Sequence, residues 1–235
     1  MALIKKFRIK KFKEQKVILK LEKISMFYNK RQILSSLDLK INQQEILGML
    51  GPNGVGKSTI FHIITGLKDP SFGKVLINGI DCTNIPIYER ASKFKLGYVP
   101  QYGGFIQDLT LIENLNLVGE IHIKEKDLRK SKIEKIISQF EFDPLLKIKA
   151  KHLSGGQKKK LVISMALIND PNILLLDEPF AALDILTIKM LQEIIVNLQS
   201  LEKITVVVCD HQARDLLSCV AVSYTHLTLP TRAVV

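Results

Sequence analysis

The chain has 235 residues, of which 46% are hydrophobic, and a formal net charge of +11. This length suits one sizeable domain or a core with an inserted subdomain, and the apolar content is sufficient for a buried core. No apolar run approaches the roughly 18–20 residues that a membrane span needs, and the N-terminus lacks the apolar stretch of a signal peptide. The sequence therefore predicts a cytoplasmic protein, and its three cysteines, which lack metal-ligand spacing, suit a reducing compartment.

Positive charge is concentrated near the N-terminus. Residues 1–31 contain 11 lysines and arginines against Glu14 and Glu22, which gives them a net charge of +9. We define residues 1–16 as the basic arm. Such an arm can bind an anionic membrane surface or nucleic acid, but no aromatic stacking platform or base-reading helix accompanies it. We therefore favour a solvated, partly disordered tail over membrane attraction, rank nucleic acid third, and expect no specific nucleic-acid partner.

Three strands are predicted before residue 51. Residues 17–24 partly alternate between apolar and polar side chains, Tyr28 follows on a polar loop, and a second strand covers about 32–41. Residues 45–50 form a short apolar run that predicts a third strand. A planar aromatic side chain upstream of a phosphate-binding loop can stack on a purine, although packing is the more common role of a tyrosine. Tyr28 is therefore a candidate for the base-binding end of a nucleotide site.

A phosphate-binding loop follows the third strand. Nine residues match the pattern G-x-x-x-x-G-K-S and its next position: Gly51, Pro52, Asn53, Gly54, Val55, Gly56, Lys57, Ser58 and Thr59. The glycines let successive backbone N–H groups form a nest for phosphate oxygens, and the helix that begins near Lys57 points its positive end at the same place. Lys57 then reaches the β- and γ-phosphates, and the Ser58 hydroxyl can hold Mg²⁺. Strand, loop and apolar helix together predict a nucleotide site.

The middle of the chain changes from mixed elements to helices. The loop helix is expected to end near Gly66, and the next elements are a strand over 74–79, a helix over 86–94 and a strand that ends at Gln101. Residues 109–150 have helical spacing and begin with a capping box of Thr110 and Glu113. We predict a helical insert over about 103–165, which ends with the helix opened by Leu153, Ser154, Gly155, Gly156 and Gln157.

Two buried strands complete the predicted core. A continuous apolar run ends in Asp177 and Glu178, and residues 205–211 form a second such run that ends in Asp210 and His211. Fully apolar strands are typical of a parallel sheet that is covered on both faces. Ligands bind at the carboxyl edge of such sheets. The acids and the histidine are therefore expected at that edge.

In this order the motifs resemble the nucleotide-binding subunit of ABC transporters. They are the phosphate loop, Gln101, the L-S-G-G-Q segment, Asp177-Glu178, Ala182-Leu183-Asp184 and His211, and the resemblance covers about residues 17–220. The L-S-G-G-Q segment about 20 residues before the Asp-Glu pair is not a feature of other P-loop classes. The resemblance implies an α/β fold of the P-loop NTPase type, specifically an ABC-type nucleotide-binding domain with an inserted helical subdomain. It also implies ATP hydrolysis with ATP and Mg²⁺.

The resemblance assigns roles to five residues. Glu178 is the candidate general base that polarises the attacking water. His211 contacts the γ-phosphate and holds the water or Glu178 in position. Asp177 and Ser58 belong to the Mg²⁺ shell, and Gln101 touches Mg²⁺ and links the core to the helical insert.

The resemblance also implies partners. The segment Leu153–Gln157 forms a second phosphate cradle at a helix N-terminus, and in this family it closes on the ATP of a second subunit, arranged head to tail. With one loop and one such segment, the chain is expected to pair with a copy of itself, with Asp184 across the seam. The helical insert then pushes on integral membrane permease subunits, which implies a peripheral position on the inner face of the inner membrane.

Four stretches are similar to the ATPase of the lipopolysaccharide export machinery: residues 81–91, 97–101, 177–184 and 210–214. In that family Phe105 and Ile106 would lie in the groove for the permease coupling helix. One difference is the run Lys158–Lys160, where the family tends to arginine, since lysine lacks the bidentate fork. Two alternatives stay open: an ATPase of the branched-chain amino acid importer type, and a soluble non-transport ABC ATPase, for which the basic arm is the one favourable feature.

The last residues do not fit the family. Residues 222–231 read V-S-Y-T-H-L-T-L-P-T, which resembles the translation of a transposase-based sequencing adapter. We therefore expect native sequence to end near Val220, residues 222–235 to be adapter read-through, and the C-terminal part of the native domain to be missing. Family-like sequence beyond Val220 on resequencing the locus would support this hypothesis, and V-S-Y-T-H-L in genomic DNA would refute it.

Overall fold

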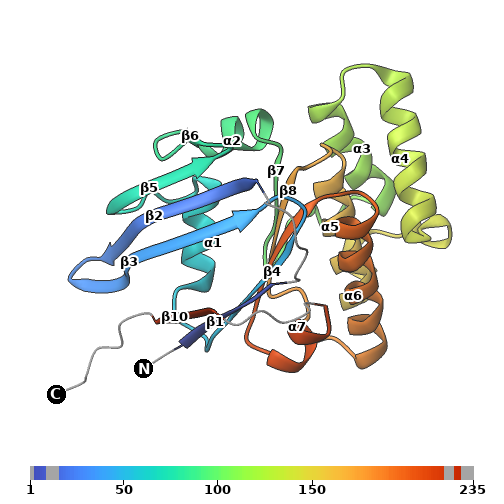
Figure 1. Cartoon of the computed structure of the whole chain (residues 1–235). Coiled ribbons are helices and arrows are strands. Elements are labelled where there is room, and N and C mark those ends of the chain that lie inside the picture. The colour runs from blue at the N-terminus through green and yellow to red at the C-terminus, as the bar shows by residue number, and fades with distance from the viewer. Residues whose placement is uncertain (1–2, 9–15, 220–224, 229–235) are drawn as a thin grey trace.

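The structure, a computed structural model, describes residues 3–8, 16–219 and 225–228, and consists of two sheets with helices packed around them (Figure 1). The larger sheet contains six strands, whose order is β10 (Thr225–Thr228), β1 (Leu3–Arg8), β4 (Ile46–Leu50), β9 (Thr205–Asp210), β8 (Ile173–Asp177) and β7 (Leu96–Val99). The strands β4, β9, β8 and β7 run parallel, and β1 is antiparallel to both of its neighbours.

The smaller sheet is antiparallel and four-stranded. Its order is β3 (Arg31–Asn42), β2 (Val17–Tyr28), β5 (Phe72–Ile77) and β6 (Ile80–Asp81). The two faces of β2 differ in burial, as expected for a sheet that covers a core with one face and meets water with the other.

Seven α-helices lie in the described part of the chain. They are α1 (Lys57–Thr65), α2 (Ile87–Lys93), α3 (Leu111–His122), α4 (Lys126–Phe140), α5 (Gly155–Leu167), α6 (Ile185–Ser200) and α7 (Ala213–Cys219), with short 3₁₀ turns at Asp143–Leu145 and Ala150–His152. The end of α1 and the start of α3 follow the sequence signals: α1 ends at Gly66 in the left-handed conformation, and Thr110 and Glu113 form the predicted capping box. None of the helices described is long and apolar enough to cross a bilayer.

Two hydrophobic cores cover opposite faces of the parallel strands. One contains α1, the inward face of the antiparallel sheet, and Leu47, Ile173 and Val207 of the parallel strands. The other contains residues of α3, α4, α5 and α6 together with the alternate positions Leu174 and Val206. Both faces of these strands are therefore buried, which explains their continuous apolar sequence. In Figure 1, α1 lies between the two sheets, and α3 and α4 stand on the side away from β2 and β3.

The structure differs from the sequence predictions near the N-terminus. The basic arm was predicted to be a solvated tail, but residues 3–8 of it form β1, whose backbone pairs with β4. Tyr28 was placed on a polar loop, but it is the last residue of β2, which is longer than predicted. Within the predicted adapter-derived segment, residues 225–228 form β10, which pairs with β1, and the rest of that segment lies outside the described residues.

Candidate functional site

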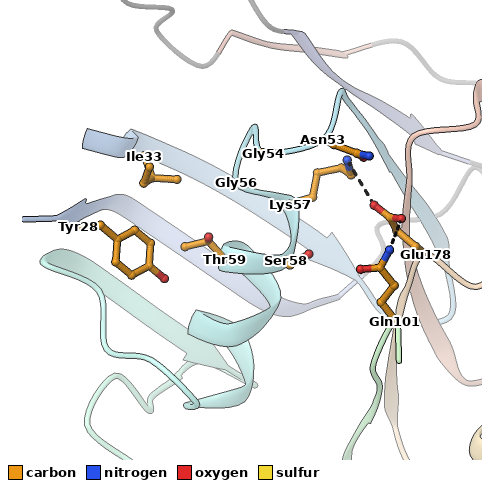
Figure 2. Close-up of a pocket in the computed structure, with 10 residues that line it drawn as sticks. All are labelled: Tyr28, Ile33, Asn53, Gly54, Gly56, Lys57, Ser58, Thr59, Gln101 and Glu178. Carbon is orange, nitrogen blue, oxygen red and sulfur yellow. Dashed lines mark hydrogen bonds and ion pairs between the residues drawn. The ribbon is translucent and has the colours of Figure 1, made fainter. Parts of the chain in front are cut away.

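A cavity of about 440 Å³, which we call the site cavity, opens at the carboxyl end of β4. Figure 2 shows the ten residues that line it: Tyr28, Ile33, Asn53, Gly54, Gly56, Lys57, Ser58, Thr59, Gln101 and Glu178. All of them except Ile33 were predicted as site residues from the sequence. Tyr28 lies at one end of the cavity and Glu178 at the other, with Thr59 and Ser58 between them. The cavity is therefore elongated, with an aromatic end and a charged end.

The phosphate loop owes its shape to glycines in the left-handed region. Gly54 and Gly56 have φ values of 78° and 105°, which side chains with a Cβ rarely adopt. A Cβ on Gly56 would also lie 3.0 Å from Leu34 Cδ2. Gly56 is the N-cap of α1 and has no side chain that could cap the helix, so the first-turn N–H groups can bind an anion instead.

Lys57 is held against its own loop. Its side chain is buried, and Nζ donates hydrogen bonds to the carbonyl oxygens of Gly51 at 2.7 Å and Pro52 at 3.1 Å. The same amine lies 3.9 Å from Oε1 of Glu178. These carbonyl and carboxylate partners hold the amine of Lys57 at a fixed position, where it can attract phosphate oxygens.

Glu178 meets two of the predicted catalytic partners. Its carboxylate accepts a hydrogen bond from Gln101 Nε2 at 2.7 Å, and Oε2 lies 3.4 Å from His211 Nδ1. The backbone of Glu178 has a φ of 45°, and its N–H donates to the Cys209 carbonyl at 2.8 Å. A glutamate in this left-handed region stores strain, which is typical of functional positions.

His211 is positioned from the backbone of its own turn. The buried carboxylate of Asp210 accepts hydrogen bonds from the N–H groups of His211 at 2.7 Å and Gln212 at 2.9 Å. The ring Nδ1 of His211 also lies 3.5 Å from Asp210 Oδ1. Asp210 thus fixes the turn that places the imidazole beside Glu178, a role that was not identified from the sequence.

Asp177 has three side-chain donors around its carboxylate. Ser58 Oγ donates to Oδ1 at 3.2 Å, Cys209 Sγ donates to Oδ1 at 2.8 Å, and Tyr98 OH donates to Oδ2 at 3.3 Å. Burial, reinforced by the negative charge of Asp177, raises the pKa of Cys209 and also the pKa of Tyr98, so both groups keep the proton that they donate. The roles of Cys209 and Tyr98 were missed in the sequence analysis. Cys209 pairs with Asp177 in the β8–β9 register, and register is not visible in a single sequence.

The oxygen groups near the phosphate loop fit a magnesium ion. Mg²⁺ is usually held by one or two protein oxygens together with substrate phosphates and water, rather than by a cage of protein ligands. Ser58 and Asp177 present hard oxygen atoms side by side at the loop. Within the described ranges no group of three or more His, Cys, Asp and Glu side chains forms such a cage.

The L-S-G-G-Q segment does not line the site cavity. Ser154 caps α5 in a capping box with Gln157: Ser154 Oγ accepts from the Gln157 N–H at 3.3 Å, and Gln157 Oε1 accepts from the Ser154 N–H at 2.8 Å. Leu153 is buried in the core. Gly155 and Gly156 lie against the start of α6, since a Cβ on Gly156 would be 2.4 Å from Thr187 Cγ2.

Asp184 lies beside this segment. It is the exposed N-cap of α6 and accepts hydrogen bonds from the Thr187 side chain at 2.6 Å and the Thr187 N–H at 3.0 Å. These hydrogen bonds from Thr187 hold the pKa of Asp184 below its usual range. Asp184 and the L-S-G-G-Q segment therefore share a surface at the beginnings of α5 and α6, apart from the chain's own site cavity.

Lys159 connects the helix α5 with the strand end at Gln101. Its Nζ donates to the carbonyl oxygens of Gln101 at 3.0 Å and Pro100 at 3.4 Å. Burial lowers the pKa of Lys159, and the nearby acids, led by Asp177, oppose this shift. In the sequence this lysine stands out only as a departure from arginine, and its contact with the strand end was not predicted.

Tyr28 has one cation close to its ring. Lys68 Nζ lies 5.0 Å from the ring centroid, a distance at which a cation is attracted to the face of an aromatic ring. The ring is 38% exposed, which leaves part of it open to a planar ligand in the site cavity.

Comparison with known proteins agrees with this geometry. The family model described as ABC transporter matches residues 34–181, which is more than half of the chain. The chain is 38% identical over 197 residues to an uncharacterized ABC transporter ATP-binding protein of Rhizobium meliloti, covering 84% of this chain and 72% of that protein. It is 36% identical over 204 residues to the lipopolysaccharide export system ATP-binding protein LptB of Haemophilus influenzae, covering 85% and 83%.

A similar solved structure is a nucleotide-binding dimer. The ATP-binding cassette MJ0796 was determined as a dimer in a post-hydrolysis state bound to ADP and Pi. The match has a TM-score of 0.74 and 28% identity, and covers 85% of this chain and 90% of that one. The match therefore spans most of both chains.

Proposed function

This chain belongs to the ABC transporter family as an ATP-binding, ATP-hydrolysing subunit, and we propose that it powers the export of lipopolysaccharide from the inner membrane. The assignment of the substrate rests on the similarity to LptB of Haemophilus influenzae, which spans 83% of that protein at 36% identity. The sequence stretches that resemble the lipopolysaccharide export ATPase include the segment 177–184, which contains Glu178 of the site cavity.

For the chemistry, we propose that Glu178 accepts a proton from the attacking water. Its carboxylate is held by Gln101 and lies next to His211, which leaves it oriented at the charged end of the site cavity. Lys57 and the N-terminus of α1 stabilise the negative charge of the phosphates. Mg²⁺, when bound at Ser58 and Asp177, neutralises charge on the phosphate oxygens.

ABC cassettes form dimers and partner with membrane permease subunits, and the second half of the site fits this arrangement. We propose that Ser154, Gly155 and Gly156 bind the ATP held by a second copy of the chain, with Asp184 at the seam. This assignment explains why the segment is exposed at a helix N-terminus but does not line the chain's own cavity.

We propose that the permease binds at a cleft of about 230 Å³ between α3, α5 and β7, which we call the docking cleft. Its lining is mainly apolar and includes Pro100, Gly104, Val118, Met165 and Ala166. Ile106 is exposed, whereas Phe105 packs against the core. Binding there would place the chain at the cytoplasmic face of the inner membrane.

Reconstitution with the native permease tests the substrate. Subunits that co-purify with the chain from detergent-solubilised membranes are placed in vesicles that contain lipopolysaccharide, and ATP-dependent release of lipopolysaccharide is measured. Release that stops with Glu178→Gln but continues with the exposed Glu193→Gln supports the proposal. Uptake of branched-chain amino acids without lipopolysaccharide release, or co-purification with ribosomes instead of a polytopic protein, would contradict it.

The same variant tests the chemistry. Glu178→Gln should keep ATP binding, abolish hydrolysis and trap a dimer, because the amide preserves the shape of the side chain but cannot accept the proton. Hydrolysis at the normal rate in this variant would remove Glu178 from the role of base.

A further inference from the structure

Tyr98 lies between the two functional surfaces of the chain but belongs to neither of the predicted sites. It lies on β7, three residues before Gln101. Tyr98 is among the residues that line the docking cleft and is not among those that line the site cavity. The ring packs edge-on against Phe61 and His62 of α1, with centroid distances of 6.3 Å and interplanar angles of 83° and 86°. The position of Tyr98 is therefore fixed by the helix that carries the phosphate loop.

The hydroxyl of Tyr98 has two polar neighbours. It lies 3.3 Å from Asp177 Oδ2 and 3.5 Å from His62 Nε2. The phenol donates its single hydrogen to the carboxylate oxygen of Asp177. The tyrosine oxygen then accepts a hydrogen from His62 Nε2, which selects the tautomer of the imidazole that carries its hydrogen there. The three groups form a chain in which His62 donates to Tyr98 and Tyr98 donates to Asp177.

The two oxygens of Asp177 are therefore used differently. Oδ2 accepts from Tyr98, whereas Oδ1 accepts from Cys209 and Ser58. Rotation of a carboxylate about its last side-chain bond is soft, with a broad two-fold preference. A donor fixed on Oδ2 limits that rotation and keeps Oδ1 directed at the Ser58 hydroxyl, where the proposed Mg²⁺ would bind.

We propose that Tyr98, supported by His62, is a positioning residue that orients the Asp177 carboxylate for binding of Mg²⁺ together with ATP. The inference rests on the proposed magnesium role of Asp177. Tyr98 itself touches neither the nucleotide nor the metal, and its effect is exerted on the second oxygen of the carboxylate.

Equilibrium binding of Mn²⁺ tests this inference without depending on hydrolysis. Mn²⁺ is titrated into the full chain in the presence of a saturating non-hydrolysable ATP analogue, and bound metal is measured by electron paramagnetic resonance. Tyr98→Phe removes a donor that orients the metal-binding carboxylate, so it should weaken Mn²⁺ binding by about ten-fold or more. Binding of the analogue in EDTA should not change, because no donor to the phosphates has been removed.

Two variants serve as controls. Tyr88→Phe also removes one phenolic hydroxyl, but its ring is 70% exposed and lies on α2, so Mn²⁺ affinity should match that of the unmodified chain. His62→Ala removes the supporting donor while the phenol is kept, and should reproduce part of the loss. If Tyr98→Phe fails to fold, His62→Ala tests the same chain of hydrogen bonds from its other end.

The outcomes separate the inference from the proposed function. Unchanged Mn²⁺ affinity in Tyr98→Phe, or an equal loss of metal-free nucleotide affinity, would overturn the positioning role. Asp177→Asn is measured in parallel: a loss of Mn²⁺ affinity there, without one in Tyr98→Phe, leaves the role of Asp177 intact and rejects that of Tyr98. Unchanged affinity in Asp177→Asn would reject the magnesium assignment itself.

Discussion

Arg90 offers the sharpest test of how the phosphate-loop helix is held in place. Its side chain is fully buried, and its guanidinium donates four hydrogen bonds to backbone carbonyls: to Ile85 at 2.6 Å, Ile63 at 2.7 Å, Thr83 at 2.7 Å and Ile64 at 2.9 Å. Two of these carbonyls belong to the last turn of α1. The Ile63 carbonyl also accepts from the Gly66 N–H at 3.3 Å. A cation at that end supplies donors to the carbonyls of the last turn and interacts favourably with the helix dipole.

The substitution Arg90→Met removes all four donors and keeps much of the side-chain volume. A buried polar group that loses its partner costs about 1–3 kcal/mol, and removal of the buried guanidinium recovers part of its desolvation cost. With two or three carbonyls left unpaired, we expect the free energy of unfolding to fall by about 3–5 kcal/mol. For a chain of this size that corresponds to a decrease in Tm of about 6–20 °C.

Urea denaturation measures this change directly. Arg31→Met is the matched control, since it makes the same chemical change at an exposed position on β3, and we expect it to alter the free energy of unfolding by less than about 0.5 kcal/mol. A loss below about 1 kcal/mol in Arg90→Met would show that water or a backbone shift satisfies the carbonyls, and would refute the role of Arg90 as the cap of α1.

Two further predictions concern the pH dependence of stability and the contact of Lys159 with Gln101, which joins α5 to the site cavity. Burial raises the pKa of the Cys82 and Cys209 thiols above their usual value of 9.0. The stability that the neutral thiols contribute is therefore complete below about pH 9, and it is lost as the pH rises through the pKa values of the thiols in the folded state. Unfolding free energy measured by urea titration should fall above about pH 9, and less steeply in the double variant with alanine at both cysteines. Lys159→Met should lower kcat by about ten-fold with nucleotide affinity unchanged, because Gln101 loses a charged donor to its carbonyl. Steady-state ATPase assays check this, with Lys158→Met as the neighbouring control; equal effects of the two variants would contradict the coupling.

Local chemistry accounts for the parts of the fold that the sequence predicted. The turn at Gly54 and Gly56 needs left-handed backbone, which glycine provides without a Cβ clash. The capping boxes at Thr110 and Ser154 need partners only three residues away. Each of these features lies within a few residues of chain, so the sequence alone contains both partners.

Features whose partners are far away in the sequence were not predicted, because no short segment contains both partners. The strand β1 lies in a lysine-rich segment with no clear apolar alternation, and it forms because β4 presents an unpaired edge about 40 residues away. Tyr98 and Asp177 are 79 residues apart in sequence, and Lys159 and Gln101 are 58 apart. Such contacts depend on how strands align, and one sequence carries no direct record of that alignment.

The alignment of the parallel strands is what assembles the site. In the β4–β9 pair Leu50 is opposite Asp210, and in the β8–β9 pair Asp177 is opposite Cys209. The chain therefore leaves β4, β8 and β9 at one edge of the sheet, and the phosphate loop, Glu178 and His211 start there. A slip of one residue between two strands would turn every side chain of the slipped strand to the opposite face.

Side-chain alternation along β8 would by itself direct Asp177 and Glu178 to opposite faces of the sheet. Successive side chains of an extended strand point to opposite faces, yet Asp177 contacts Ser58 and Glu178 contacts Lys57, both on the phosphate-loop helix. The left-handed φ of 45° at Glu178 ends the alternation and turns its carboxylate back to the same side. Such a residue costs about 1 kcal/mol or more, and the hydrogen bond from its N–H to the Cys209 carbonyl helps to hold it there. The strained backbone at Glu178 therefore lets both adjacent acids contact the first turn of the phosphate-loop helix.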